Sequence, residues 1–347
     1  MKARAPALPL VDGVQGARCL VTGGAGFIGS SLVRVLLKGG ADVVAYDNLA
    51  TGHESNLANC LEQTGRAPRF VHGDVRDREK LSRTLPGTDF VFHLACLGVR
   101  HSIHSPFENL DVNARGTLSV LAEARAAKVK RLVHTSTSEV YGTAKTVPMS
   151  EEHPTDPHTV YGASKLDGEC CARAFFRCYG SPVVIVRPFN AYGPRSHSEG
   201  DSGEVIPRFL VRAIVGKAPV IFGDGSQTRD FTHVYDTAAC LVRAAVTPGI
   251  EGETFNIGAG SEVRVDELAK IVVAAASRPA LVAEHIEARP GDVLRLFADS
   301  SKAQRVLGHT STVSLHDGIA DLATRLRALG DEAVQAMDAA IVVRNWT

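Results

Sequence analysis

Thr22–Gly29 reads TGGAGFIG, and the residues on either side of this stretch decide the fold class of the chain. The apolar residues Cys19–Val21 run into the glycines, and Phe27–Lys38 then carries apolar side chains at helical spacing. A second apolar segment, Val43–Asp47, ends on an acid 18 residues after the last glycine. A strand, a glycine turn, an amphipathic helix and a strand ending in an acid together predict a βαβ unit that binds a dinucleotide.

The three glycines and the acid have separate expected roles. Gly23, Gly26 and Gly29 let the turn adopt positive φ and let the backbone approach a pyrophosphate, which then sits on the amides of the helix N-terminus. Asp47 is placed to accept hydrogen bonds from both ribose hydroxyls of the adenosine half. Its charge repels a 2′-phosphate, so the sequence predicts NAD as cofactor in preference to NADP.

Composition excludes several classes of protein. The 347 residues are 44% hydrophobic and carry zero formal net charge, which indicates a globular chain without the basic surface of a nucleic-acid-binding protein. Seven cysteines are scattered without any C-x-x-C pair, as in a cytoplasmic protein with free thiols. No apolar run approaches the ~20 residues of a membrane span, so we expect no contact with a membrane.

Strand-like and helix-like segments alternate through the first half of the chain. Repeated βα units of this length predict an α/β fold, a Rossmann-type doubly wound parallel sheet with a smaller C-terminal substrate-binding lobe. We expect an NAD-binding domain over 17–189, to which 230–258 returns, and a substrate-binding lobe over 190–229 and 259–330. The expected strands are Arg18–Thr22, Val43–Asp47, Arg69–Gly73, Phe90–Ala95, Arg131–Ser136, Pro182–Arg187 and one within Gly252–Gly260. The expected helices are Phe27–Lys38, Arg78–Leu85, Asn113–Ala127, Tyr161–Tyr179 and Val265–Ala276.

A second motif, Tyr161-Gly-Ala-Ser-Lys165, predicts the chemistry. Residues at i and i+4 share one face of a helix, so the phenol and the ammonium lie together. A free tyrosine is a poor base at neutral pH, but a neighbouring cation and an oxidised nicotinamide ring favour its phenolate. Thr137, at the end of the fifth strand, can bind the same substrate hydroxyl. Tyr161 then accepts the hydroxyl proton while hydride passes to the cofactor.

These motifs are joined by others in an order that resembles the extended short-chain dehydrogenases/reductases, and specifically the nucleotide-sugar epimerases and dehydratases. The similarity covers about residues 17–310. Its further motifs are YDNLATG (46–52), GDVRD (73–77), HLA (93–95), DVNARGT around Asn113, STSEVYG (136–142), RPFNAYGPR (187–195), GDGSQTRDF (223–231) and RPGD (289–292).

The resemblance implies roles for individual residues. It implies that the cofactor is held by Gly23, Gly26, Phe27, Ile28, Gly29, Asp47, Asn48, Asp74, Val75, Leu94, Ala95, Asn113, Tyr161 and Lys165. It implies that the substrate, a UDP-, dTDP- or GDP-linked sugar, contacts Asn190, Val205, Ile206, Pro207, Phe209, Arg229, Arg289 and Asp292. Arg100 and His101 are expected to contact the sugar because of their place in the segment after the fourth strand. Helices 113–127 and 161–179 resemble those that pair two subunits in relatives, so a homodimer is expected.

The family shares oxidation of the hexose at C4, and its members differ in the second step. A 4,6-dehydratase needs a base for the C5 proton, and Glu139 in the catalytic segment Thr137-Ser138-Glu139 is placed for it. Many dehydratases have an acid at the position of Ser138, whereas a 4-epimerase needs none. Ser138 thus counts against a dehydratase and Glu139 counts for one. On the strength of Glu139 we favour a 4,6-dehydratase narrowly over a 4-epimerase, and place a UDP-glucuronate decarboxylase third. A non-catalytic NAD-binding sensor and a simple dehydrogenase that releases NADH rank below these three.

The segment Gly98–Pro106 follows the fourth strand and is expected to be a loop that lines the sugar pocket. His101 and His104 have the i, i+3 spacing of a metal pair, but no third ligand accompanies them, so we expect no metal there. Cys96 stands where relatives have a small residue, and we expect it to narrow the sugar pocket.

Overall fold

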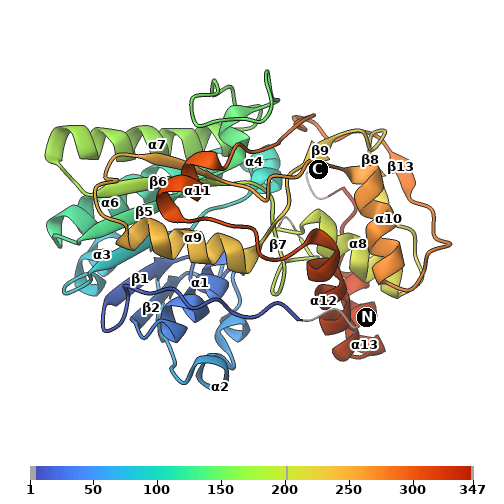
Figure 1. Ribbon diagram of the computed structural model, residues 1–347, viewed down its shortest axis with the longest axis horizontal. Helices are drawn as coiled ribbons and strands as arrows, with labels where there is room; N and C mark the ends of the chain where they lie inside the picture. The colour runs from blue at the N-terminus through green and yellow to red at the C-terminus, as the bar shows by residue number, and fades with distance from the viewer. Residues whose placement is uncertain (1–4, 201, 345–347) are drawn as a thin grey trace.

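The computed structural model describes residues 5–200 and 202–344 of the chain. Its centre is a seven-stranded parallel sheet with the order β11-β6-β5-β4-β1-β2-β3 (Figure 1). The strands are β1 (Arg18–Thr22), β2 (Asp42–Asp47), β3 (Arg69–His72), β4 (Phe90–His93), β5 (Arg131–Thr135), β6 (Val183–Pro188) and β11 (Thr254–Ile257). The predicted α/β class with a doubly wound parallel sheet is confirmed. The strand order reverses between β1 and β4, and ligands of such sheets bind beyond the carboxyl ends of the strands at that point.

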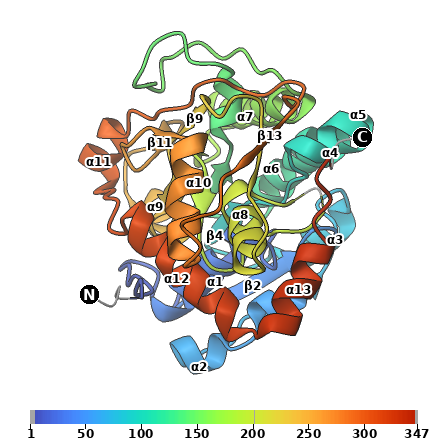
Figure 2. The ribbon, with the colours of Figure 1, turned by 90° about the vertical axis from the view of Figure 1, so that its right-hand side faces the viewer.

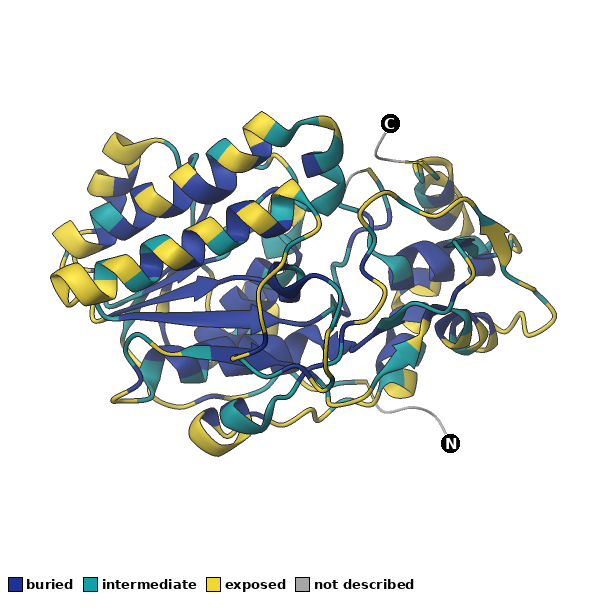
Figure 3. Ribbon diagram, turned by 90° about the horizontal axis from the view of Figure 1, so that it is seen from above, coloured by how far each residue is buried: buried dark blue, intermediate teal, exposed yellow. Residues whose placement is uncertain are grey.

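Alternate side chains of the strands pack on opposite faces of the sheet. Cys19 and Val21 of β1 contribute to one buried cluster, and Leu20 between them contributes to another. The first cluster includes α1 (Phe27–Lys38), α9 (Val234–Val246) and α11 (Ser301–Leu307). The second includes α3 (Arg78–Thr84), α6 (Gly116–Ala126) and α7 (Val160–Tyr179). Figure 3 shows buried strands in the middle of the sheet and covering helices exposed on their outer sides, whereas the edge strand β3 is partly exposed.

A further apolar cluster lies outside the sheet and is built by helices from the second half of the chain (Figure 2). These helices are α8 (Val205–Ile214), α10 (Val265–Ala275), α12 (Leu315–Ala328) and α13 (Asp331–Ala339). Three two-stranded sheets accompany them: β7 (Ala191–Tyr192) with β10 (Thr232–His233), β8 (Val220–Phe222) with β13 (Glu284–Ile286), and β9 (Thr228–Arg229) with β12 (Val263–Arg264). The predicted division of the chain into two domains stays a prediction.

Short helical turns occupy several connections for which the sequence predicted loops. Gly98–Pro106, expected to be a loop, contains α4 (Val99–His104) and the start of α5 (Pro106–Leu110). The π-helical turn η2 (Asp111–Arg115) then joins α5 to α6 without a break. The remaining turns are η1 (Glu54–Leu57), α2 (Cys60–Thr64) and η3 (Ser138–Tyr141). Among the described residues, no helix has both the length and the apolar character needed to cross a membrane.

Candidate active site

A cavity of about 480 Å³ opens beyond the carboxyl ends of the strands, between the sheet and the helices of the second half of the chain. This volume is typical of small-molecule sites. Most of the predicted site residues line it. They are Gly23, Gly26, Phe27, Ile28, Gly29, Asp47, Asn48, Val75, Leu94, Ala95, Arg100, Thr137, Ser138, Glu139, Tyr161, Asn190, Val205, Ile206, Phe209, Arg229, Arg289 and Asp292.

Five predicted residues do not line the cavity. The Nζ of Lys165 donates to the Thr135 carbonyl at 2.7 Å. Asp74 accepts hydrogen bonds from Arg76 and Asn48, and His101 lies 3.3 Å from a carboxylate oxygen of Glu108. The others are Asn113, which also binds neighbouring protein groups, and Pro207, which is buried in α8.

Asn113 lies on the π-helical turn and holds the chain that follows β4. Its side-chain oxygen accepts the Leu97 N–H at 2.8 Å, and its Nδ2 donates to the Leu97 carbonyl at 3.0 Å. The same Nδ2 lies 3.1 Å from the Ser164 hydroxyl oxygen on α7. Asn113 therefore positions the segment that carries Cys96 against the helix that carries Tyr161, rather than facing the cavity itself.

The glycine turn leaves no room for side chains. Gly23 has φ +68°, and a Cβ there would lie 2.8 Å from the Ala95 backbone nitrogen. A Cβ on Gly29 would lie 1.9 Å from the Gly23 carbonyl oxygen, so α1 can pack on the turn only with glycine at this position. Gly26 caps α1 without any side-chain hydrogen bond, and the first turn of this helix carries no acid. Its first amides therefore face the cavity free to bind an anion.

Asp47 ends β2 inside the same cavity and is 7% exposed. Its Oδ2 accepts the Ala25 N–H at 2.9 Å and its Oδ1 accepts the Leu49 N–H at 2.8 Å. These bonds fix the carboxylate against the glycine turn and leave each oxygen a further lone pair for a ribose hydroxyl. The turn and the acid thus fit the pyrophosphate and adenosine ribose of NAD.

Tyr161 lies in the first turn of α7 and lines the cavity beside Thr137. Burial raises the pKa of its phenol, the charge of Cys96 adds to this, and the hydrogen bond with Thr137 opposes it. Burial also lowers the pKa of Lys165. The Lys165 ammonium binds the Thr135 carbonyl, and the lowering of the Tyr161 pKa that the sequence predicts is not found in the protein alone.

Glu139 and Ser138 enter the cavity from η3, which Thr137 caps by accepting the Glu139 N–H at 3.2 Å. The Glu139 carboxylate acts electrostatically on both Tyr161 and Arg229. It is therefore close enough to the tyrosine and to Arg229 for its charge to act on both. No second carboxylate accompanies it within Thr137–Glu139, because position 138 is serine.

Cationic side chains gather at the end of the cavity away from the glycine turn. Arg229 and Arg289 both donate to Oδ1 of Asp292, at 2.9 and 2.6 Å. Burial lowers the pKa of Arg100 to about 9 and that of Arg208 to about 10, and in both the charge of Arg289 adds to this. Among the described residues, the buried Nε atoms of Arg100 and Arg289 and Nη1 of Arg208 have no hydrogen-bond partner. This surplus of buried guanidinium groups suits a diphosphate.

Sequence reasoning missed several residues that line the cavity. Arg208 stands in α8 among apolar side chains, and a lone cation inside the run VIPRFLV is the signal that identifies it. Glu204, directly before this helix, also lines the cavity, and burial raises the pKa of its carboxyl to about 7. His197 approaches from the preceding segment, which the sequence treated only as a Gly/Pro/Ser-rich stretch.

A Rossmann sheet with a glycine turn, a buried tyrosine and an arginine-rich pocket on one cavity defines an NAD-type enzyme of the extended short-chain dehydrogenase/reductase class. The chain belongs to the family described as GDP-mannose 4,6-dehydratase, whose family model matches residues 20–322. The resemblance proposed from the sequence motifs is thereby confirmed.

Relatives with two different reactions are about equally similar to the chain. The UDP-glucose 4-epimerase of Mycolicibacterium smegmatis is 37% identical over 87% of this chain and 96% of the relative. The dTDP-glucose 4,6-dehydratase of Streptomyces niveus is 34% identical over 88% of this chain and 91% of the relative. The structure of DesIV, a dTDP-glucose 4,6-dehydratase of Streptomyces venezuelae with NAD bound, superposes with a TM-score of 0.85 at 35% identity and covers 92% of this chain and 99% of that one.

Proposed function

We propose that this protein oxidises the hexose of a nucleotide sugar at C4 and keeps the 4-keto intermediate bound. The second half of the reaction then uses the same cofactor molecule. One observation carries the proposal: a tyrosine base, a glycine turn of the dinucleotide type and a cluster of arginines open onto one cavity. That cavity can hold a cofactor and a diphosphate-linked sugar with the reacting carbon near the phenol. A sensor without catalysis has no need of the Tyr161 and Lys165 pair.

NAD is the proposed cofactor. When bound, it accepts a hydride from C4 and returns one to the sugar. Gly23, Gly26 and Gly29 form the turn for its pyrophosphate, and Asp47 accepts its ribose hydroxyls. The buried Asp47 charge disfavours a 2′-phosphate, which is the reason for proposing NAD over NADP.

Tyr161 is the proposed acceptor of the C4 hydroxyl proton, and Thr137 and Lys165 support it. Tyr161 accepts the proton as phenolate, Thr137 donates a hydrogen bond that favours the phenolate, and Lys165 fixes the end of β5 through Thr135. Because burial raises the pKa of Tyr161, the positive charge of the oxidised nicotinamide ring is the remaining influence that favours phenolate. Proton removal is thus coupled to the oxidised state of the cofactor.

Glu139 supports 4,6-dehydration as the second half of the reaction. The C4 ketone acidifies the C5 proton, Glu139 removes this proton, and the C6 hydroxyl leaves as water after receiving a proton from the same carboxyl. Glu139 lines the cavity and influences Tyr161, so it is placed near the carbon that Tyr161 serves.

A 4-epimerase is the second candidate, and Ser138 is the observation that favours it. Epimerisation turns the ketone over and returns hydride to its other face, which needs no acid or base beyond Tyr161. Relatives named as epimerases are as similar to the chain as those named as dehydratases. Decarboxylation of a uronate ranks third.

The arginine cluster supports a nucleoside diphosphate-linked sugar as substrate. Arg229 and Arg289 hold the diphosphate as planar cationic forks, while Asp292 keeps both in position. Val205, Ile206, Pro207 and Phe209 lie within the first five residues of α8, and all but Pro207 line the cavity. We place the nucleotide base at this end of the helix, with UDP, dTDP and GDP as the alternative nucleotides.

We further propose a cytoplasmic homodimer. All seven cysteines are free, which suits a reducing compartment. Exposed apolar side chains gather on α5, α6 and α7, namely Phe107, Leu110, Leu118, Val160, Phe176 and Tyr179. A second copy of the chain would cover such a face.

Incubation with a panel of nucleotide sugars, with product masses measured in deuterated water, tests the reaction. We expect loss of one water and incorporation of deuterium at C5. An unchanged mass with a new retention time and no C5 deuterium means epimerisation, and loss of carbon dioxide means decarboxylation. If none of the sugars is converted, the proposed function is wrong.

Glu139→Gln separates the two leading reactions. In a dehydratase the variant oxidises C4 and then stalls, so the absorbance of bound NADH accumulates and C5 exchange stops. In an epimerase the variant keeps a substantial part of its turnover. Glu152→Gln removes an exposed carboxylate of the same charge and serves as the matched control.

A further inference from the structure

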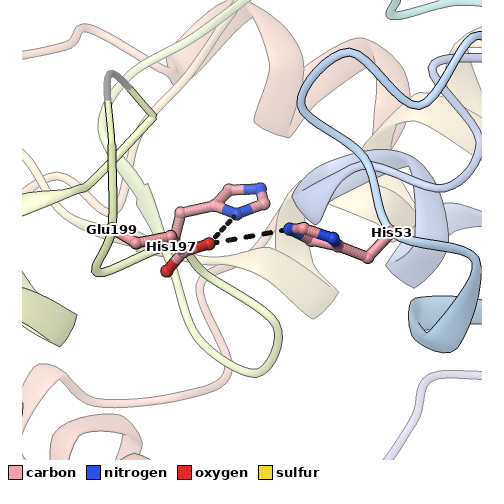
Figure 4. A group of neighbouring side chains, drawn as sticks. All are labelled: His53, His197 and Glu199. Carbon is pink, nitrogen blue, oxygen red and sulfur yellow. Dashed lines mark hydrogen bonds and ion pairs between the residues drawn. The ribbon is translucent and has the colours of Figure 1, made fainter. Parts of the chain in front are cut away.

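Two segments from opposite sides of the cavity bring three possible metal ligands together (Figure 4). His53 follows β2 and caps η1, while His197 and Glu199 lie between β7 and α8. The rings of His53 and His197 have centroids 5.9 Å apart. Among residues 5–200 and 202–344, no other group of three His, Cys, Asp or Glu side chains meets so closely. None of these three residues has a part in the proposed reaction.

The distances fit one coordinated ion. Oε1 of Glu199 lies 3.1 Å from Nδ1 of His197 and 3.7 Å from Nε2 of His53. One ligand atom from each residue lies within 4.8 Å of the other two. Tetrahedral zinc, with bonds of about 2.0–2.2 Å, places its ligand atoms about 3.3–3.6 Å apart. Small rotations of the exposed His53 and Glu199 side chains therefore suffice to coordinate a metal.

Hydrogen bonds to neighbouring protein groups position the three proposed ligands. Oε2 of Glu199 accepts the Ser198 N–H at 2.9 Å, which leaves Oε1 directed at the two histidines. Glu204 accepts the His197 N–H, and the backbone N–H of His53 donates to the Ala25 carbonyl at 3.1 Å. Such supporting bonds orient metal ligands.

We propose that His53, His197 and Glu199 bind one divalent transition-metal ion of the zinc type, with water in the fourth position. Two imidazoles and one carboxylate favour Zn²⁺ over Mg²⁺ and Ca²⁺, which prefer oxygen ligands. Because His53 is bonded to the glycine turn through Ala25, the ion ties that turn to the segment before α8. It thereby links the cofactor side of the cavity to the substrate side.

Metal titration of the full-length protein tests the site without measuring catalysis. After treatment with a chelator, we expect one Co²⁺ per chain with the visible absorption of a tetrahedral complex, and displacement by Zn²⁺. His197→Ala and Glu199→Gln should each weaken this binding by at least about 100-fold, because each removes one of three protein ligands. Zn²⁺ should raise the unfolding temperature of the unmodified chain but of neither variant.

The control variants test whether the metal binds at these three residues or at a histidine elsewhere in the chain. His285→Ala removes an exposed ring far along the chain and should leave Co²⁺ binding unchanged. His53→Gln alters the most exposed ligand and should weaken binding even if His197→Ala fails to fold. Absence of stoichiometric binding by the unmodified chain, or equal binding by all variants, would overturn the proposal, and neither outcome bears on the proposed sugar chemistry.

Discussion

Tyr161 is the residue on which the proposed chemistry depends. Tyr161→Phe keeps the buried ring and removes the proton acceptor, so the fold and NAD binding should persist. Loss of a general base costs typically ~10²–10⁴-fold, and C4 oxidation should fall by that factor. Single-turnover formation of NADH measures it. Near-normal turnover in this variant would show that another group is the base.

The hydrogen bond from Thr137 to Tyr161 can be tested through the pH dependence of the reaction. This hydrogen bond lowers the pKa of Tyr161, so Thr137→Val should raise that pKa and leave less phenolate at any given pH. The ascending limb of the profile of kcat/KM against pH should therefore move to higher pH. Thr137→Ser retains the hydroxyl and should keep the original limb. A Thr137→Val profile that is lower but not displaced would indicate a purely structural role.

At the scale of elements, a buried ion pair fastens α7 to the sheet. Arg187 of β6 donates to both carboxylate oxygens of Glu169 on α7, at 2.8 and 2.6 Å, and to the hydroxyl of Tyr141 at 2.6 Å. Both partners of the ion pair are at most 3% exposed. The bidentate pair holds the middle of α7, the helix that carries Tyr161 in its first turn, against the strand that comes next in the chain.

Glu169→Gln should leave Arg187 buried without its counter-charge and lower the free energy of unfolding by about 3–5 kcal/mol. Burial acts to raise the pKa of Glu169, but the Arg187 bonds outweigh it and lower the pKa in the folded state. The stabilisation is thus complete above the ordinary value of 4.5 and is lost as the pH falls below it. Denaturant unfolding at several pH values measures both effects.

The matched control for this prediction is Glu79→Gln in α3. Glu79 pairs with Arg83, but these side chains are 75% and 76% exposed. Water screens such pairs, so the change should alter stability by less than about 1 kcal/mol. Equal effects of the two substitutions would show that burial of the Arg187 pair contributes nothing.

At the scale of the whole molecule, the exposed apolar face of α5, α6 and α7 predicts self-association. Light scattering should give twice the chain mass of 36.9 kDa. Leu118→Arg places a charge on α6 within this face and should shift the protein to monomer. Leu329→Arg changes an exposed leucine at the end of α12 and should leave the dimer intact. A monomeric unmodified protein would contradict the prediction.

The sequence by itself determined the glycine turn and the elements around it, because contacts between residues close in the chain control their geometry. The glycine turn was predictable because a Cβ at Gly23 or Gly29 meets backbone, and no other residue type relieves that contact. The elements β1, α1 and β2 were also predictable, because their apolar residues recur with the period of a strand or of a helix. Spacing alone also placed Tyr161 and Lys165 on one helix.

Tertiary structure decided the features that depend on residues distant in the sequence. α8 went unpredicted, and it buries its apolar side against α10 and α12, which come more than 50 residues later in the chain. Arg100 and Arg208 join Arg289 only in the fold, and the approach of His53 to His197 likewise required both segments in place. The pKa of Tyr161 is raised rather than lowered because desolvation is set by everything packed around the phenol, which the spacing of two residues on a helix does not encode.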